Sequence, residues 1–166
     1  KKQVINTREP ILLKLARKVF AMTENNFWEI LDKLDWTHEG DDEKVMEPVK
    51  NALAQLSDED IFEFDNIMSS KLYDLDSRER AQKLYGTLEH FSADTFLYNR
   101  CVAIVNGKEY YEDILNQRQQ LNPDLEFESI LYLPALAWAQ KHHESMDEYP
   151  HVPEPNYESG SNTLLW

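Results

Sequence analysis

Residues 57–73, SDEDIFEFDNIMSSKLY, contain the clearest helical signal in this chain of 166 residues. The hydroxyl of Ser57 can accept a hydrogen bond from an exposed helix amide, and the acids that follow it favour the positive end of a helix. The apolar positions then recur at helical spacing: Ile61, Phe64, Met68, Leu72 and Tyr73. This stretch therefore predicts an amphipathic helix with one face in a core.

Helical spacing continues on both sides of this stretch. We expect further helices at residues 23–34, 45–56, 81–85, 92–106, 110–115 and 127–138. Pro134 must kink or divide the last of them, because proline cannot donate a backbone hydrogen bond. Only four glycines are present, and no alternating pattern is long enough for a sheet. The predicted fold is all-α, an irregular or orthogonal bundle of about six to seven helices with a proline-rich C-terminal tail.

The composition divides the chain into three parts. Residues 1–21 are predicted to be a basic amphipathic extension or leader, in which Pro10 precedes an apolar stripe at helical spacing. Residues 22–145 are predicted to form one acidic helical domain. Residues 146–166 are polar and contain prolines, so they form either a tail or a wrap over the surface of the domain.

The net charge of −14 is unevenly distributed along the chain. Residues 1–21 contain six Lys or Arg and one Glu, which leaves 11 basic and 30 acidic residues in the rest. An acidic surface repels phosphate backbones, so we expect no nucleic-acid binding by the main body. Such a surface steers a basic protein toward itself, although acidity can also serve only to keep a protein soluble.

Several features bear on where the protein resides. No apolar run approaches the roughly 20 residues that span a bilayer, and the first residues lack the pattern of a signal peptide. The lone cysteine, Cys101, cannot form an internal disulfide. We therefore expect a cytoplasmic protein without membrane contact, in which Cys101 is buried and unreactive.

No residue pattern is typical of a catalytic, cofactor or metal site. The imidazoles of His142 and His143 would lie about 100° apart on a helix, whereas a zinc-binding helix places its ligands at positions i and i+4. His38 lies in an acidic loop that lacks the spacing of a calcium loop. The sequence therefore predicts no metal, no cofactor and no catalytic residue, and it favours binding over chemistry.

Residues 91–100, FSADTFLYNR, are followed by an apolar stretch and then by residues 107–112, GKEYYE. This pair of segments resembles the central signature of the bacterial domain-of-unknown-function 4240 (DUF4240) family, which runs Ser-Asp-Asp-x-Phe-x-x-Phe-Arg and then Gly-Arg/Lys-x-x-Tyr-Glu. Further familial segments extend the resemblance to about residues 24–145. The chain departs from the family pattern at residues 88–91, at Ala93, and at Tyr98-Asn99.

The resemblance implies a small helical fold and supplies no catalytic residues, because the family has no established activity. Ser92 is expected to cap the helix that carries Arg100, and Arg100 is expected to hold a carboxylate from another helix. In the alternative, Arg100 forms a small-molecule or enzymatic pocket between helices with Tyr98, Tyr110 and Trp138.

Composition and charge favour a non-enzymatic module that binds a basic protein partner. Its sharpest version is an immunity protein that masks the active site of a nuclease toxin in interbacterial competition, and a structural or regulatory module is a further alternative. The expected contacts are acids at helix ends and in loops, together with an aromatic anchor: Trp36, Glu39, Asp41, Asp42, Asp58, Glu59, Asp60, Asp74 and Asp76. Reversing the charges of Asp41 and Asp42 is expected to slow association and to leave thermal stability nearly unchanged.

Overall fold

The computed structural model describes residues 21–166, which form seven α-helices and three 3-10 helices without a β-strand. The α-helices are α2 (Glu24–Leu31), α3 (Asp42–Leu53), α4 (Asp58–Asp74), α5 (Arg78–Tyr85), α6 (Ala93–Val105), α7 (Lys108–Leu115) and α8 (Leu133–His142). The 3-10 helices are η1 (Trp36–His38), η2 (Glu128–Tyr132) and η3 (Met146–Glu148). The all-α prediction is confirmed, and the predicted basic extension lies, except for Ala21, outside the described residues.

Side-chain caps start α4 and α6 where the sequence predicts them. The hydroxyl of Ser57 accepts a hydrogen bond from the amide of Asp60 at 3.1 Å, and the hydroxyl of Ser92 accepts one from Thr95 at 3.2 Å. Gly86 follows α5 with a φ of 75°, a left-handed conformation that glycine adopts without steric cost. These local contacts explain why the helix starts could be predicted from short sequence patterns.

Two prolines act differently in the helices. The expected division at Pro134 is present: η2 ends at Tyr132, and α8 begins at Leu133 with the proline in its first turn. A first-turn residue needs no intrahelical hydrogen-bond donor, so proline is tolerated there. Pro48 lies inside α3, and the helix continues through it.

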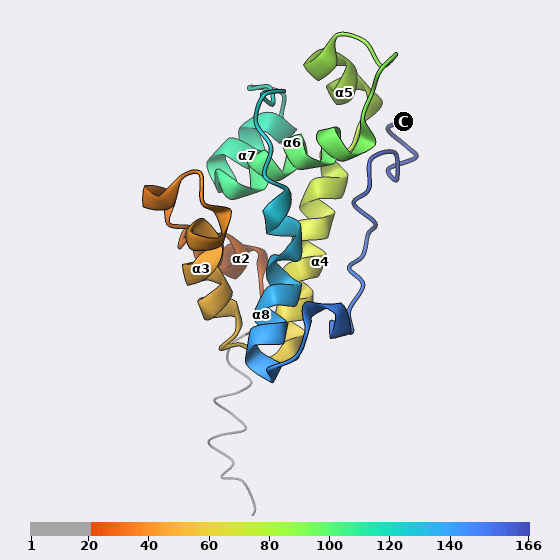
Figure 1. Ribbon diagram of the computed structural model, residues 1–166. Coiled ribbons are helices and arrows are strands. Elements are labelled where there is room, and N and C mark those ends of the chain that lie inside the picture. The colour runs from red at the N-terminus through yellow and green to blue at the C-terminus, as the bar shows by residue number, and fades with distance from the viewer. Residues whose placement is uncertain (1–20) are drawn as a thin grey trace, which may run out of the picture.

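The helices pack in an irregular, crossed arrangement around one main core. Figure 1 shows α4 and α8 running side by side, with α3 against α8 and with α6 and α7 crossing near the far end of α4. The rings of Phe27 and Phe64 lie 4.7 Å apart in this core, and Cys101 is fully buried. Burial raises the pKa of the Cys101 thiol to about 12, as expected for a thiol among apolar side chains.

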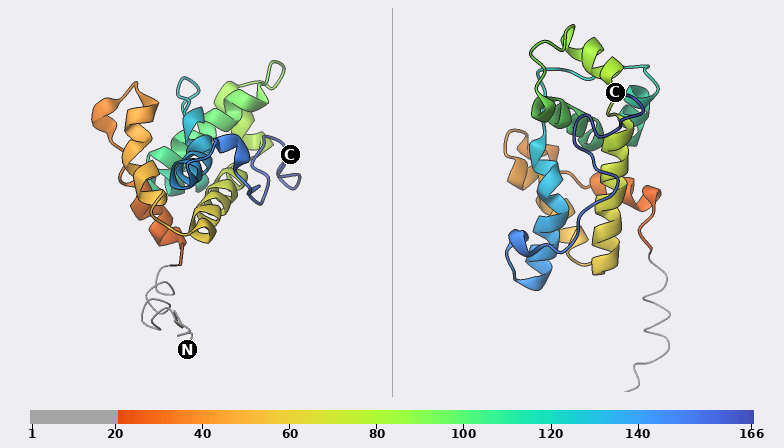
Figure 2. Two further views of the ribbon diagram at one scale, coloured as in Figure 1. Left: turned by 60° about the horizontal axis from the view of Figure 1, so that its bottom comes forward. Right: turned by 90° about the vertical axis from the view of Figure 1, so that its right-hand side faces the viewer.

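Residues 146–166, here called the strap, begin with η3 and then run in an irregular path beside α4 to the C-terminus (Figures 1 and 2). The hydroxyl of Tyr149 donates to Asp65 at 3.1 Å, and Nε2 of His151 lies 2.9 Å from Oδ1 of Asn66. Because both acceptors lie on α4, the strap wraps the helical domain. Within residues 21–166, no helix has the length and apolar character needed to cross a membrane.

Candidate functional site

The residues expected to contact a partner lie in three separate places. The first group spans η1, the turn after it and the start of α3 (Trp36, Glu39, Asp41 and Asp42). The second lies at the start of α4 (Asp58, Glu59 and Asp60), and the third lies at and just beyond the end of α4 (Asp74 and Asp76). With 17 residues, α4 is about 25 Å long, so its two ends are far apart on the surface. The structure therefore does not bring these residues into one contact face.

The first group, here called the Trp36 corner (Trp36, Glu39, Asp41 and Asp42), is held by local caps. The Asp35 carboxylate accepts from the amide of Thr37 at 3.1 Å and starts η1, and Asp41 accepts from the amide of Lys44 at 3.2 Å and starts α3. Trp36 remains 43% exposed and contacts the ring of Phe127 edge-on, at 5.7 Å between centroids. An indole is thus presented to solvent on a turn with a fixed backbone.

The segment around η2 lies against the Trp36 corner. The hydroxyl of Ser129 donates to Asp42 at 2.6 Å, and the neighbouring Phe127 supports Trp36. This segment adds two exposed apolar side chains, Leu125 and Tyr132, and three acids, Asp124, Glu126 and Glu128. Residues 124–132 therefore combine exposed apolar side chains with carboxylates, and they contact the Trp36 corner through Phe127 and Ser129.

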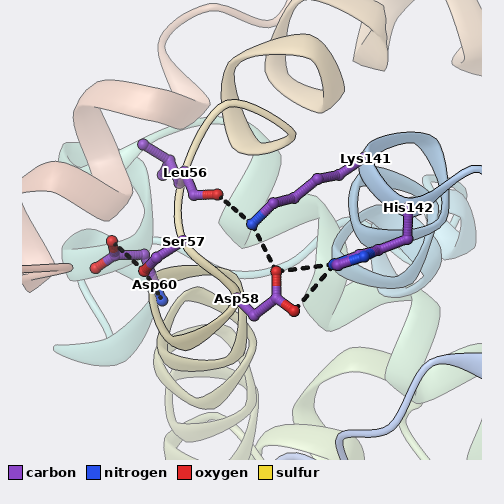
Figure 3. A network of polar contacts seen from close by, with 6 residues as sticks. All are labelled: Leu56, Ser57, Asp58, Asp60, Lys141 and His142. Atoms are coloured by element: carbon purple, nitrogen blue, oxygen red, sulfur yellow. Dashed lines mark hydrogen bonds and ion pairs between the residues drawn. The ribbon is translucent and has the colours of Figure 1, made fainter. Parts of the chain in front are cut away.

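The second group joins two helices (Figure 3). The ammonium of Lys141 donates to Asp58 at 2.6 Å and to the carbonyl of Leu56 at 2.8 Å, while Nε2 of His142 lies 2.9 Å from Asp58. Partial burial opposes ionisation of Asp58, but the hydrogen bonds from the two α8 side chains outweigh it and hold the pKa of Asp58 below its ordinary value. The network ties the start of α4 to the end of α8.

The same network does not form a nucleophile–base pair. A His–Asp contact acts in nucleophilic catalysis when the histidine also meets a hydroxyl or a thiol. Here the hydroxyl of Ser57 donates to Asp60 at 2.7 Å, and Cys101 is buried in the core (Figure 3). In the described part of the chain, no three His, Cys, Asp or Glu side chains are arranged to hold a metal ion.

Asp76 differs from its expected place on an exposed acidic surface. Its exposed fraction is 0%, and its carboxylate accepts from the amides of Gly160 and Asn162, each at 3.0 Å, and from the indole N–H of Trp166 at 2.7 Å. All three donors belong to the strap. Asp76 therefore anchors the C-terminus and is not available to a partner, whereas Asp74 is exposed.

Arg100 also differs from its expected role. It is fully buried and donates to the carbonyl of Leu72 at 2.7 Å, the carbonyl of Tyr157 at 3.0 Å and the hydroxyl of Ser159 at 2.9 Å. These acceptors are neutral, so the expected clamp on a carboxylate is wrong. Instead, the guanidinium links α4 to the strap and lies over the ring of Phe96, 4.9 Å from its centroid.

The four residues of the alternative pocket lie in different surroundings. The strap covers the guanidinium, and Trp138 belongs to a separate small cluster with Ile61 and Tyr149. Tyr98 and Tyr110 pack instead against the main core. The prediction of a pocket between helices did not include the strap. In the structure, the carbonyl of Tyr157 and the hydroxyl of Ser159 from the strap lie beside Arg100.

A different pocket was not anticipated from the sequence. It has a volume of about 70 Å³ and lies between α5 and the segment that follows α7, and we call it the α5 pocket. Its lining combines apolar, amide and charged groups: Ser77, Glu79, Arg80, Lys83, Leu84, Ile114, Gln117, Gln119, Gln120 and Leu121. The glutamines cluster at residues 117–120, but this weak compositional signal does not by itself indicate a site.

A family model described as a protein of unknown function (DUF4240) matches residues 22–140, which include the Trp36 corner, α5 and Arg100 but not the strap. Neither the curated proteins nor the solved structures include a match to this chain. Because the family model spans more than half of the sequence, the chain belongs to the DUF4240 family.

Proposed function

We propose that this protein is a non-enzymatic module that binds a basic protein through the Trp36 corner. In its most specific form it is an immunity protein that masks the basic active site of a nuclease toxin. The observation that carries the proposal is the exposed indole of Trp36 beside three carboxylates on a turn that is fixed by capping hydrogen bonds. In such an interface, Trp contributes mainly to affinity and charged residues mainly to the association rate.

The indole supplies tightness. Binding energy in protein interfaces concentrates in a few residues, among which Trp is enriched, and these residues become fully desolvated in the complex. Trp36 still has 43% of its surface to lose, and its contact with Phe127 restricts the indole before binding. Little ordering of this side chain is then needed on association, which favours affinity.

The carboxylates supply speed and selectivity. A nuclease site is built to attract phosphates and therefore carries positive charge, which an acidic surface complements. Glu39, Asp41 and Asp42 lie within six residues of Trp36, and Lys44, which pairs with Asp41 at 2.7 Å, is the only Lys or Arg among residues 36–49. Charges of this kind act mainly on the association rate and on the rejection of wrong partners.

The proposal is tested by affinity capture with the full chain, followed by identification of the captured protein. A basic protein is expected, with its affinity reduced at least about tenfold by Trp36→Ala, as for a residue that contributes more than about 1.4 kcal/mol. Leu165→Ala is the matched control, because Leu165 is a similarly exposed apolar residue, at 49%, in the strap.

The captured protein is then assayed for nuclease activity with and without this chain. Inhibition by the wild type and weaker inhibition by Trp36→Ala would support the immunity function. Capture that is equal for the wild type and Trp36→Ala would contradict the use of the Trp36 corner. A basic partner whose activity is unchanged in the complex would remove the immunity function and leave only the binding module.

A further inference from the structure

The α5 pocket has an apolar floor and a polar rim. Leu84 on α5, Ile114 on α7 and Leu121 after α7 supply aliphatic surface, and Ile114 and Leu121 are almost completely buried. The rim carries Arg80 and Lys83 from α5 and the amides of Gln117, Gln119 and Gln120. The pocket is lined from α5, and Figure 1 shows α5 apart from α3, the helix that follows the Trp36 corner.

Arg80 brings to the rim a positive charge that forms no salt bridge within residues 21–166. The guanidinium is half-buried and donates to the carbonyl of Leu75 at 2.9 Å, to the hydroxyl of Ser77 at 3.3 Å and to the carbonyl of Leu115 at 3.3 Å. These three bonds hold the side chain in place through neutral acceptors. Because a guanidinium has five N–H groups, two of them have no acceptor among residues 21–166.

The burial of Arg80 has an electrostatic consequence. Desolvation lowers the pKa of Arg80 below its ordinary value, while the nearby Glu79 only partly opposes this effect. Glu79 itself pairs with Lys83 at 2.6 Å. Two cations therefore share a single carboxylate at the rim of this pocket, in a chain whose net charge is −14.

Gln117 is held over the pocket in an unusual backbone conformation. Its φ is 57°, in the left-handed region that residues other than glycine rarely adopt and that costs about 1 kcal/mol or more. Two hydrogen bonds from Arg118 to Asp113 hold the turn. The backbone N–H of Arg118 donates to the Asp113 carbonyl at 2.8 Å, and Nε of Arg118 donates to the Asp113 carboxylate at 2.6 Å. In this conformation, the side-chain oxygen of Gln117 accepts from Lys83 at 2.7 Å.

We propose that the α5 pocket binds a small aliphatic carboxylate. The carboxylate would take the free donors of Arg80 and Lys83, since charge-assisted hydrogen bonds are stronger than neutral ones. The short aliphatic part would lie on Leu84, Ile114 and Leu121. At roughly 10–15 Å³ for each water-sized group, the pocket volume of about 70 Å³ admits about five to seven non-hydrogen atoms.

Isobutyrate is a suitable probe because it has this size, one carboxylate and a branched aliphatic part. Titration of the full chain with isobutyrate, followed by ¹H–¹⁵N NMR, is expected to give saturable shifts at Ser77 and residues 117–121. Isobutyramide has the same shape without the charge, and inorganic phosphate has charge without the aliphatic part. Both are expected to bind at least about tenfold more weakly than isobutyrate, because each lacks one of the two interactions.

Substitutions at the rim should move the affinity in opposite directions. Lys83→Met keeps an unbranched side chain and removes the charge, and it is expected to weaken isobutyrate binding threefold to tenfold, by roughly 0.7–1.4 kcal/mol. Glu79→Gln removes the competing carboxylate and is expected to tighten binding by about a factor of two or three. The matched control is Lys44→Met, because Lys44 is similarly exposed and pairs with Asp41 at 2.7 Å far from the pocket.

Each outcome decides the proposal. Saturable shifts confined to the pocket, weakened by Lys83→Met and unchanged by Lys44→Met, would support it. It would be overturned by the absence of saturable shifts at these residues, by equal binding of isobutyrate and isobutyramide, or by equal binding to the wild type and to Lys83→Met. The measurement does not involve a protein partner, so its result is independent of the proposed role of the Trp36 corner.

Discussion

Asp65 is a carboxyl group that is only 4% exposed and that accepts a hydrogen bond from Tyr149 of the strap. Burial raises the pKa of Asp65 to about 7, far above the ordinary value of 3.8. The folded protein therefore binds a proton at Asp65 more tightly than the unfolded chain does. Between about pH 4 and pH 7, this group makes the free energy of unfolding fall as the pH rises.

Asp65→Asn should remove this dependence, because the amide keeps an oxygen for Tyr149 and carries no charge. Urea unfolding is expected to find the variant similar to the wild type at pH 5 and more stable at pH 8, by about 1–3 kcal/mol. Glu63→Gln, at an exposed position of α4, is the control and should show no such increase. A variant that is less stable than the wild type at pH 8 would contradict the ionisation of a buried Asp65.

Cys101 allows a second test at the scale of single residues. Its thiol is fully buried and its pKa is raised to about 12, so the reactive thiolate is scarce at neutral pH. We expect a thiol reagent at pH 8 to modify the folded protein at least about a hundredfold more slowly than the chain unfolded in urea. Comparable rates in the two states would show that the core around α6 opens readily.

At the scale of elements, the strap is attached through a charged group that no local pattern predicts. Asp74 and Asp76 are two residues apart, and the sequence offers the same interpretation for both, namely acids near a helix end. The structure gives the two residues different environments. The Asp76 carboxylate accepts hydrogen bonds from three strap residues, which lie 84 to 90 positions later in the sequence. By contrast, the hydroxyls of Ser57 and Ser92 each accept a hydrogen bond from the amide three residues later, so both could be predicted as helix caps.

Asp76→Ala should therefore be far more damaging than Asp74→Ala. Removal of the carboxylate leaves buried N–H groups of the strap without an acceptor, with an expected loss of about 3–5 kcal/mol of unfolding free energy. Asp74→Ala, at an exposed position, is expected to change it by less than about 0.5 kcal/mol. In Asp76→Ala, hydrogen exchange should accelerate first at Gly160 and Asn162, and equal exchange in both variants would exclude the anchoring role.

In the candidate site too, features that depend on neighbouring residues could be predicted, and contacts between distant residues could not. An exposed Trp36 in an acidic loop follows from adjacent residues, and the structure shows an exposed Trp36 in η1 with Asp41 and Asp42 at the start of α3. The sequence could not show which acids at the ends of α4 are free to contact a partner. Asp58 accepts a hydrogen bond from Lys141 of α8, and Asp76 accepts one from Trp166 of the strap. The partners of Arg100 are backbone carbonyls and a serine hydroxyl, which carry no sequence signature at such separations.

At the scale of the whole molecule, the question is whether local or total charge guides association. Reversal of Asp41 and Asp42 cannot answer it without a loss of stability, because Asp41 caps α3 and Asp42 accepts from Ser129. Loss of a helix cap alone costs about 1 kcal/mol. Glu39 and Glu43 are better choices, since both are exposed acids at the same turn.

The double reversal Glu39→Lys with Glu43→Lys changes the net charge from −14 to −10, and so does Glu144→Lys with Glu148→Lys beyond the end of α8. If the Trp36 corner meets a basic partner, the first pair should slow association about tenfold at low salt, and the second pair much less. The difference should shrink as salt rises toward 0.5 M, because the screening length then falls to about 4 Å. The dissociation rate should change little in either double variant, because Trp36 is expected to contribute most of the binding free energy. Equal slowing by the two pairs would mean that only total charge matters, and an association rate indifferent to salt and to both pairs would remove the acidic surface from the binding mechanism.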